Sequence, residues 1–425
     1  MDDVLKLGFL GGLQRAGIVP GLDRMRALVE RLGHPQSRYP VIIVTGTNGK
    51  GSTTCFIDSI LRAAGFRTGR FTSPHLVDVR ERVFIDGRMV DAGTFARLGE
   101  ELRRVLQKES LEVTFFEALS AIGFMAFAEA GVDVAVVEVG MGGRLDSTNV
   151  SDPVVSVLTS VGLDHTSFLG STVEAIALEK TGVARPGRPF ITGVEDGLYG
   201  STVGPELERI GARPVRYGLD FTCREGVDGL DWESGGRVHR ALVPGLSGRY
   251  QSFNLCLAVA AVEAFLAVSG RTANESAYVK GARDAFWPGR FQMVARDPVV
   301  ILDGCHNVHG ARALKNELSS LSRPLVMVHG TRPEKDYDGV LALLAPEADA
   351  IVHAGFEGGA DPHSVAAVSV AHVRPGVAVM VEPCLSDAVA KAVALAGKSG
   401  TVLVTGSLYM IGAAIRDFGW PGFAD

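Results

Sequence analysis

The pattern of apolar and polar residues along the first part of the chain predicts strands that alternate with helices. Four consecutive apolar residues at 41–44 indicate a short buried strand, and the apolar residues of 53–64 recur at helical spacing. An apolar stripe within 22–32 ends at Gly33 and predicts an earlier helix. The run 132–139 indicates a strand buried on both faces. This alternation is typical of an α/β fold.

The same alternation begins again after residue 290. The pattern predicts strands at 299–302, 325–329, 350–353, 377–381 and 402–405, with helices at 314–321, 340–344, 388–395 and 408–415. Such a series indicates a small, doubly wound parallel domain. A chain of 425 residues is also longer than one ordinary core requires. We therefore expect two domains, at 1–289 and 290–425.

A glycine-rich turn joins the first predicted strand to its helix. It consists of Gly46, Thr47, Asn48, Gly49, Lys50, Gly51 and Ser52, with Thr53 following. Backbone N–H groups and a helix N-terminus in this arrangement can hold a phosphate. Lys50 adds a positive charge, and the Ser52 hydroxyl suits Mg²⁺. The strict phosphate-loop pattern is not met, because Val44 replaces its first glycine and Gly51 follows the lysine, so a turn without a nucleotide is the alternative.

Polar residues follow several predicted strands, where α/β folds place ligand-binding groups. Ser73 lies in a loop after the second strand, and His165 follows a later one. Glu138 lies near the end of the buried strand 132–139, where a carboxylate is costly unless it is paired or binds a metal such as Mg²⁺. Asp303 opens a similar polar turn in the second domain. A capping role for Glu138 and a structural role for His165 are the alternatives.

Composition narrows the class of protein. A net charge of −6 and a pI of about 6.0 argue against a general nucleic-acid or membrane-surface binder. The five cysteines are scattered without a CxxC pair, as in a reduced cytosolic protein. The first nine residues lack the features of a signal peptide, and the apolar stretch 118–128 is too short to span a bilayer. We expect a cytoplasmic protein without nucleic-acid or membrane partners, and a monomer by default.

Taken in order, the short motifs of the chain resemble those of the folylpolyglutamate synthase/dihydrofolate synthase family of the Mur ligase superfamily. The motifs are GTNGKGS at 46–52, SPHL at 73–76, EVG at 138–140, GGRLD at 142–146, LDH at 163–165, EK at 179–180, PGR at 288–290, DGCHN at 303–307 and TGSLY at 405–409. The resemblance implies a P-loop central ATPase domain of the Mur ligase type and a smaller Rossmann-like C-terminal α/β domain.

The resemblance also implies an activity. Enzymes of this family use ATP to join L-glutamate to the carboxylate of dihydropteroate or of a folate such as tetrahydrofolate, through an acyl phosphate. We favour an enzyme that acts on both dihydropteroate and a folate that already carries glutamate. The nearest alternative is a ligase of the same superfamily that acts on a different carboxylate. A kinase or switch NTPase would have the strict phosphate loop and would not need a second α/β domain, and this sequence shows neither feature. A catalytically silent binding protein would not need Lys50, Glu138, His165 and Lys180 to be intact.

The resemblance also implies roles for individual residues that occupy the motif positions of this family. Lys50, His165 and Lys180 match catalytic positions, and Lys180 matches a lysine that carries a carbamate in many relatives. Ser52 is expected near the Mg²⁺ of ATP, whereas Ser73, Glu138 and His165 match ligands of a second Mg²⁺. The nucleotide contacts expected outside the loop are Asn254, near the adenine, and Arg290, Asp303 and His306. The substrate contacts expected are Thr114, Phe116, Arg144, Asp146 and Ser407.

Two departures from the family pattern concern the second domain. Cys305 stands where the family usually has alanine, beside an expected ATP contact. The segment 355–361 lacks an expected Pro-Arg turn, which removes one arginine from the predicted glutamate contacts.

Overall fold

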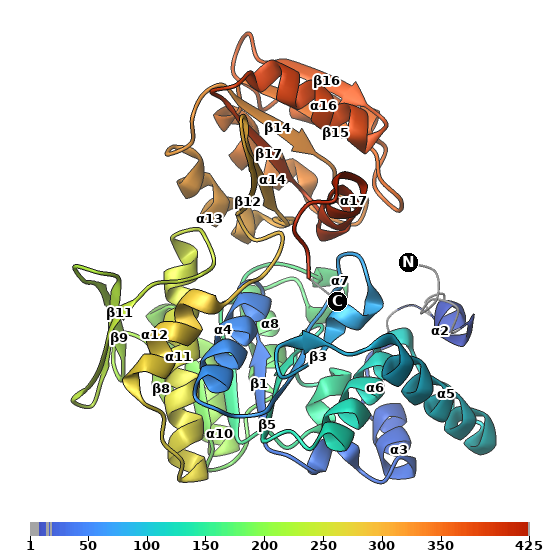
Figure 1. Cartoon of the computed structure of the whole chain (residues 1–425), viewed down its shortest axis with the longest axis vertical. Helices are drawn as coiled ribbons and strands as arrows, with labels where there is room; N and C mark the ends of the chain where they lie inside the picture. The colour runs from blue at the N-terminus through green and yellow to red at the C-terminus, as the bar shows by residue number, and fades with distance from the viewer. Residues whose placement is uncertain (1–7, 14–16, 18, 424–425) are drawn as a thin grey trace. The chain divides into compact units, whose positions relative to one another are not determined.

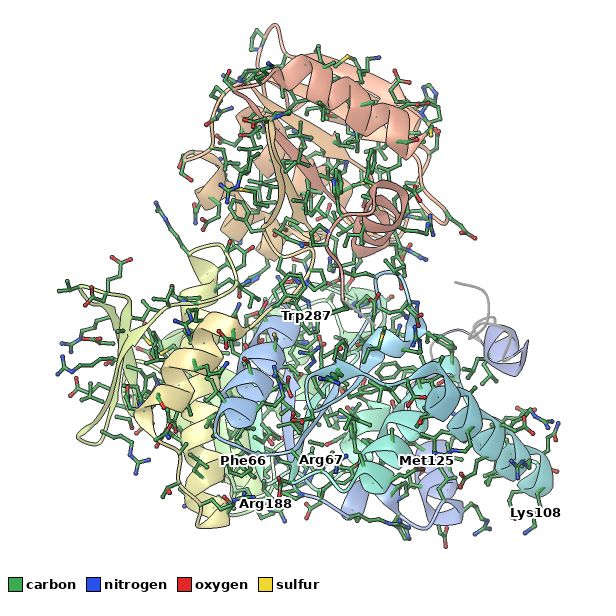
Figure 2. All side chains as sticks on the ribbon, viewed as in Figure 1. Phe66, Arg67, Lys108, Met125, Arg188 and Trp287 are labelled. Carbon is green, nitrogen blue, oxygen red and sulfur yellow. The ribbon has the colours of Figure 1, made fainter. Side chains whose placement is uncertain are left out.

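The computed structural model describes residues 8–13, 17 and 19–423. Residues 1–7, for which the sequence predicts no signal peptide, lie outside the described residues. The described chain divides into two units (Figure 1). The N-terminal unit runs to Gly245 and includes Gln251–Phe286. The C-terminal unit consists of Leu246–Tyr250 and Trp287–Phe423. Trp287, labelled in Figure 2, is therefore the residue at which the chain enters the second unit for its main length.

The N-terminal unit is built on an eight-stranded sheet with the strand order β4-β3-β2-β5-β1-β6-β7-β8. Its strands are β1 Val41–Thr45, β2 Thr68–Phe71, β3 Val83–Ile85, β4 Arg88–Met89, β5 Val134–Glu138, β6 Val155–Leu158, β7 Pro189–Thr192 and β8 Arg213–Arg216. β2, β5, β1, β6, β7 and β8 are parallel, whereas β3 and β4 extend one edge in antiparallel fashion. The predicted strands at 41–44 and 132–139 form the centre of this sheet.

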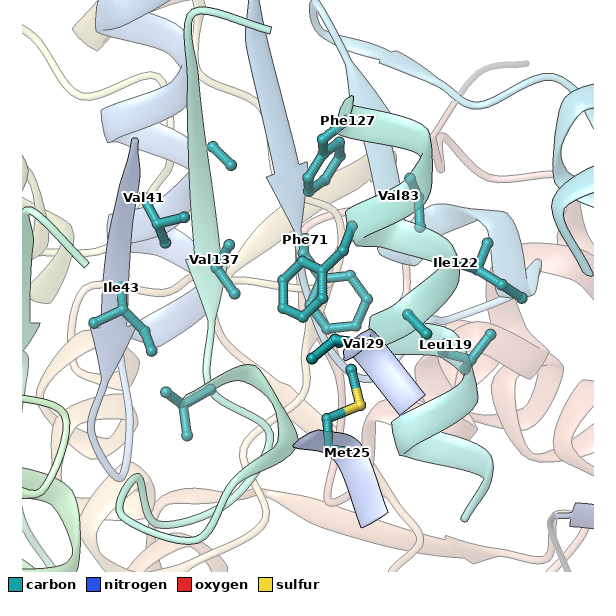
Figure 3. Packing of buried hydrophobic residues seen from close by; sticks show 14 of the residues in the cluster. Met25, Val29, Val41, Ile43, Phe71, Val83, Leu119, Ile122, Phe127 and Val137 are labelled. Carbon is teal, nitrogen blue, oxygen red and sulfur yellow. The ribbon is translucent and has the colours of Figure 1, made fainter. Parts of the chain in front are cut away.

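Helices cover both faces of this sheet, which explains why its central strands are continuously apolar. On one face, Ile43 of β1 and Val137 of β5 belong to one core with Phe71, Ile122 and Phe127 (Figure 3). α4, which follows the glycine-rich turn, lies against β1, β2 and β5. The helices of the unit are α2 Gly8–Leu13, α3 Asp23–Arg31, α4 Lys50–Ala63, α5 Ala92–Glu109, α6 Phe115–Ala130, α7 Thr166–Leu169, α8 Val173–Thr181, α9 Asp196–Leu198, α10 Gly204–Ile210, α11 Tyr250–Ser269 and α12 Glu275–Asp284.

A small antiparallel sheet precedes α11. It consists of β9 Thr222–Glu225, β10 Leu230–Ser234 and β11 Arg237–Leu242, and it packs on α12. Among the described helices, α11 alone is long and apolar enough to cross a membrane by length and composition. Most of its apolar window, 61%, is buried inside the structure, as in a core helix.

The C-terminal unit contains a six-stranded sheet with the strand order β12-β13-β17-β14-β15-β16. The strands are β12 Gln292–Arg296, β13 Val299–Asp303, β14 Leu325–His329, β15 Ala350–Ala354, β16 Ala378–Glu382 and β17 Thr401–Thr405, and the helices are α13 Val308–Leu318, α14 Tyr337–Leu344, α15 Pro362–Ser369, α16 Leu385–Ala396 and α17 Leu408–Phe418. The doubly wound fold is confirmed, but the prediction of a wholly parallel sheet is wrong at one edge. β12, which the sequence did not predict, pairs antiparallel with β13.

Candidate active site

The glycine-rich turn lies between the carboxyl end of β1 and the first turn of α4, as predicted. Loop 159–162, which follows β6, holds this turn from the side. The Thr47 N–H donates to the Ser160 carbonyl at 2.8 Å, and the Asn48 N–H donates to Ser160 Oγ at 3.0 Å. Thr159 Oγ1 donates to the Asn48 carbonyl at 2.6 Å. The glycine-rich turn is thus fixed through its own backbone. α4 begins at Lys50, so its N-terminus lies at this turn.

Gly49 is required by its conformation and by its neighbour. Its φ of 85° is in the left-handed region, and a Cβ there would overlap Oδ1 of Asn254. Asn254 comes from the first turns of α11 and donates to Gln251 Oε1 at 2.9 Å. The Asn254 amide lies against the phosphate loop, and its expected contact with the adenine stays a prediction.

Two lysines converge on one carbonyl of the loop. Lys50 Nζ donates to the carbonyls of Gly46 and Thr47 at 3.0 and 3.2 Å, and Lys180 Nζ donates to the same Gly46 carbonyl at 2.9 Å. Burial, together with the nearby Lys50 charge, lowers the pKa of Lys180 to about 7. Lys180 therefore loses its proton readily near neutral pH, which an exposed lysine does not.

Glu179, which precedes Lys180 in the chain, has a different role. Its carboxylate accepts from Arg144 Nη2 at 2.5 Å on the surface of the unit. This ion pair raises the pKa of Arg144 further. Arg144, predicted as a substrate contact, is thus exposed and paired with Glu179.

The structure brings two of the predicted metal ligands together. Glu138 is the last residue of β5 and is buried, and its Oε2 accepts from the Ser73 N–H at 3.1 Å. His165 precedes α7 with φ at 51°, and its backbone N–H donates to Asp164 Oδ1 at 2.9 Å. Within the described ranges, no three His, Cys, Asp or Glu side chains cluster as a metal site. A cation at Glu138 therefore needs hydroxyl or ligand oxygens in addition.

The remaining substrate candidates of the N-terminal unit have structural contacts. Asp146 is buried, and its carboxylate accepts from the Met141 N–H at 2.9 Å and from the Thr148 hydroxyl at 2.6 Å. Burial raises the pKa of Asp146. Thr114 caps α6 in a reciprocal arrangement with Glu117. These contacts fix the loop after β5 and the start of α6.

Phe116 and the loop after β2 form a neighbouring group. Phe116 packs on Phe71 with ring centroids 6.0 Å apart, and a Cβ at Gly140 would overlap its ring. Nearby in the chain, His75 Nδ1 accepts from Arg82 Nε at 2.9 Å. Burial and the Arg82 charge lower the pKa of His75 to about 3, so His75 is a neutral hydrogen-bonding group. The sequence analysis placed His75 in the SPHL motif but did not predict its pair with Arg82.

The predicted nucleotide residues of the C-terminal unit lie around the end of β13. Asp303 Oδ1 accepts from the Cys305 N–H at 2.9 Å, and its Oδ2 accepts from the Phe291 N–H at 2.9 Å. His306 Nδ1 lies 2.9 Å from the Gly304 carbonyl oxygen, and a Cβ at Gly304 would lie 2.8 Å from Arg290 Nη1. Ser407 caps α17 through a bond from the Tyr409 N–H at 3.2 Å.

Comparison with known proteins agrees with this arrangement. Residues 44–219 match the Mur ligase middle domain, and residues 289–408 match the Mur ligase glutamate ligase domain. The dihydrofolate synthase/folylpolyglutamate synthase of Mycobacterium tuberculosis is 33% identical, over 95% of this chain and 91% of that protein. The chain spans about half the length of two archaeal relatives, probable bifunctional folylpolyglutamate synthase/dihydropteroate synthases, at 35% identity.

Solved structures are similar over the whole chain. FolC of Escherichia coli in complex with DHPP and ADP gives a TM-score of 0.89 at 32% identity, covering 98% of this chain and 97% of that one. A bifunctional folylpolyglutamate synthase/dihydrofolate synthase with Mn, AMPPNP and L-glutamate bound gives 0.85 at 29% identity, covering 97% of each. With the phosphate loop, the two α/β units and the paired domain matches, the chain belongs to the dihydrofolate synthase/folylpolyglutamate synthase family of Mur ligases.

Proposed function

We propose that this protein is an ATP-dependent ligase that joins L-glutamate to the carboxylate of a pterin or folate through an acyl phosphate. The observation that carries the proposal is the pair of lysines, Lys50 and Lys180, held at the Gly46 carbonyl of a phosphate-type loop. The named activities of the relatives and the nucleotides, DHPP and L-glutamate bound in the solved structures support it.

Each step of the reaction can be assigned to groups of this chain. Lys50, turned from its loop carbonyls to the phosphates of ATP, and the first N–H groups of α4 hold the γ-phosphoryl group while the acceptor carboxylate attacks it. The glutamate amine then attacks the acyl phosphate, the amide forms, and phosphate leaves. The cations around the loop stabilise the negative charge that develops on the phosphoryl and carbonyl oxygens. We propose Arg290, Asp303 and His306 as the nucleotide side of the C-terminal unit.

A divalent cation fits the oxygen groups beside the loop. The Glu138 carboxylate and the hydroxyls of Ser52 and Ser73 are the hard oxygen ligands that Mg²⁺ prefers, with His165 as a nitrogen ligand. Bound there, Mg²⁺ neutralises charge on the phosphate and acyl phosphate oxygens. The Mn and AMPPNP bound in the solved bifunctional synthase structure support one such ion, and a second one is part of the proposal.

Lys180 is proposed to carry a carbamate. A neutral amine attacks CO₂, forms a C–N bond and releases one proton, and a pKa of about 7 makes the neutral amine available at neutral pH. The product is an anion at the place where the ammonium of Lys180 now meets the charge of Lys50. Such an anion can help to hold a cation, which an ammonium group cannot.

The acceptor is proposed to be both dihydropteroate and a folate that already carries glutamate. Thr114, Phe116 and the loops that hold Arg144 and Asp146 are the proposed pterin side, and Ser407 the proposed glutamate side. Asp146 acts there as a positioning residue, because its carboxylate binds the loop backbone. A Mur ligase acting on another carboxylate remains the second candidate.

The cysteines within the described residues are free thiols, which supports the proposed cytoplasmic location. A monomer without nucleic-acid or membrane partners completes the proposal.

Phosphate release with Mg²⁺, ATP and L-glutamate tests the acceptor. Dihydropteroate and tetrahydrofolate are supplied in separate reactions, and release in both is expected. Lys50→Met should abolish phosphate release, while Lys108→Met, at an exposed position of α5 (Figure 2), should not. Release with neither acceptor, while ADP still binds, would move the assignment to another carboxylate within the Mur ligases. Full activity of Lys50→Met would overturn the role of the loop.

A further inference from the structure

The chain passes between the two units at more points than one linker requires. It leaves the N-terminal unit after Gly245, returns to it after Tyr250, and leaves it again after Phe286. The short segment Leu246–Tyr250 therefore packs with the C-terminal unit, although α11, which begins at Tyr250, otherwise belongs to the N-terminal unit. Because α11 begins at Tyr250, a contact that holds Tyr250 in place also holds the start of this helix.

Both crossings are held by the same carboxylate. Asp303 Oδ2 accepts from the Tyr250 hydroxyl at 3.0 Å and from the Phe291 N–H at 2.9 Å, and we call this pair of bonds the Asp303 clasp. Asp303 is 5% exposed, and burial raises its pKa. Burial and the nearby Asp303 raise the pKa of Tyr250 well above its ordinary value, so the hydroxyl keeps its proton and remains the donor.

Backbone geometry around both crossings is adapted to the Asp303 clasp. Gly248 has φ at 102°, and a Cβ there would lie 2.9 Å from the ring of Tyr250. Phe291 has φ at 48°, a conformation that non-glycine residues rarely adopt and that its bond to Asp303 helps to hold. Arg249 adds a second anchor, because its N–H donates to Glu317 Oε1 of α13 at 2.9 Å.

The other end of this arrangement is the phosphate loop. Asn254 follows Tyr250 by one helical turn on α11, and its Oδ1 lies against Gly49 of the loop. The bond from Tyr250 to Asp303 therefore fixes the helix turn that packs on the nucleotide loop.

We propose that Tyr250 is a positioning residue for the nucleotide. Through Asp303 it fixes the first turn of α11 and, with it, Asn254 at the phosphate loop. This inference rests on the proposed function only in requiring that the loop binds a nucleotide, and not on the choice of acceptor. It also gives Asp303 a role in holding the chain crossings, in addition to its proposed place on the nucleotide side of the C-terminal unit.

ADP affinity of the full chain tests the inference, because a merely structural bond in the C-terminal unit would not change it. Tyr250→Phe removes only the hydroxyl, and we expect ADP to bind about tenfold more weakly, the scale of one hydrogen bond to a charged acceptor. Tyr337→Phe, on α14 of the same unit, is the matched control and should bind ADP like the wild type. Equal affinity in all three proteins overturns the inference.

Amide exchange of the wild-type protein provides a second test that needs no variant. ADP should slow exchange at the Phe291 N–H and in the first turn of α11, because the loop and the Asp303 clasp share one helix. Binding of ADP without any change at these amides overturns the inference. Absence of ADP binding by the wild type would instead contradict the proposed function, so the two failures are distinguishable.

Discussion

A pair of buried histidines makes the C-terminal unit sensitive to acid. His329 ends β14, and its register partner on β15 is His353. Both are at most 1% exposed, their ring centroids lie 5.4 Å apart, and none of the four ring nitrogens has a hydrogen-bond partner among the described residues. Protonating either ring would place an uncompensated charge in the core.

The expected size follows from the pKa of each ring. Burial, with His353 adding to it, lowers the pKa of His329 to about 3, and burial lowers that of His353 to about 4. The unfolded chain titrates near 6.5, so below that pH it binds more protons than the folded chain and stability falls as the pH falls. At pH 5 each ring lowers the free energy of unfolding by about 2 kcal/mol relative to pH 7.5, and the pair lowers it by about 4 kcal/mol.

Urea unfolding between pH 7.5 and pH 5, followed by amide exchange in β14 and β15, measures this loss. His353→Phe should reduce the loss of stability between pH 7.5 and pH 5 by about 2 kcal/mol, since one titrating ring is gone. His363→Gln, an exposed histidine of α15, is the control and should keep the wild-type slope. The slope is the readout, because repacking around the introduced phenyl ring changes absolute stability at every pH alike. An unchanged slope in His353→Phe would refute the reasoning.

Three further predictions concern the phosphate loop and its neighbours. Gly49→Ala combines a φ of 85° with a clash against Asn254, so ADP affinity should fall at least about tenfold in a calorimetric titration, and unchanged affinity would contradict the packing. Glu138→Gln should weaken Mn²⁺ binding measured by electron paramagnetic resonance in the presence of ADP, and equal binding would exclude Glu138 as a ligand. Activity should fall when bicarbonate is removed and return when it is restored, whereas Lys180→Met should be inactive in both buffers, and a bicarbonate-independent wild type would exclude the carbamate.

Several elements could be predicted because one physical signal dominated locally. β1, β5 and β14 are short apolar runs buried in parallel sheets, and the expectation of 325–329 for β14 agrees with the structure. β12 was missed because it is an edge strand with polar and half-exposed residues. α5 was also missed, although its buried Phe95, Leu98 and Leu102 follow helical spacing and could have revealed it.

The site could be predicted only in part. The loop 46–52 carries its own signal, and Glu138 is conspicuous as a carboxylate ending an apolar strand. The convergence of Lys50 and Lys180 requires the end of α8 to lie at the Gly46 carbonyl, a tertiary contact that no local pattern encodes. The Asp303 clasp was not predictable either, because Tyr250 and Phe291 reach it from segments far apart in the sequence.

The central claim is that the acceptor carboxylate is activated as an acyl phosphate. Dihydropteroate labelled with ¹⁸O in its carboxylate, incubated with Mg²⁺, ATP and L-glutamate, tests it by mass spectrometry of the released phosphate. Attack of the carboxylate on the γ-phosphoryl group, followed by attack of the glutamate amine, predicts one ¹⁸O in each phosphate and one in the new amide. Amide formation that releases unlabelled phosphate would contradict the account.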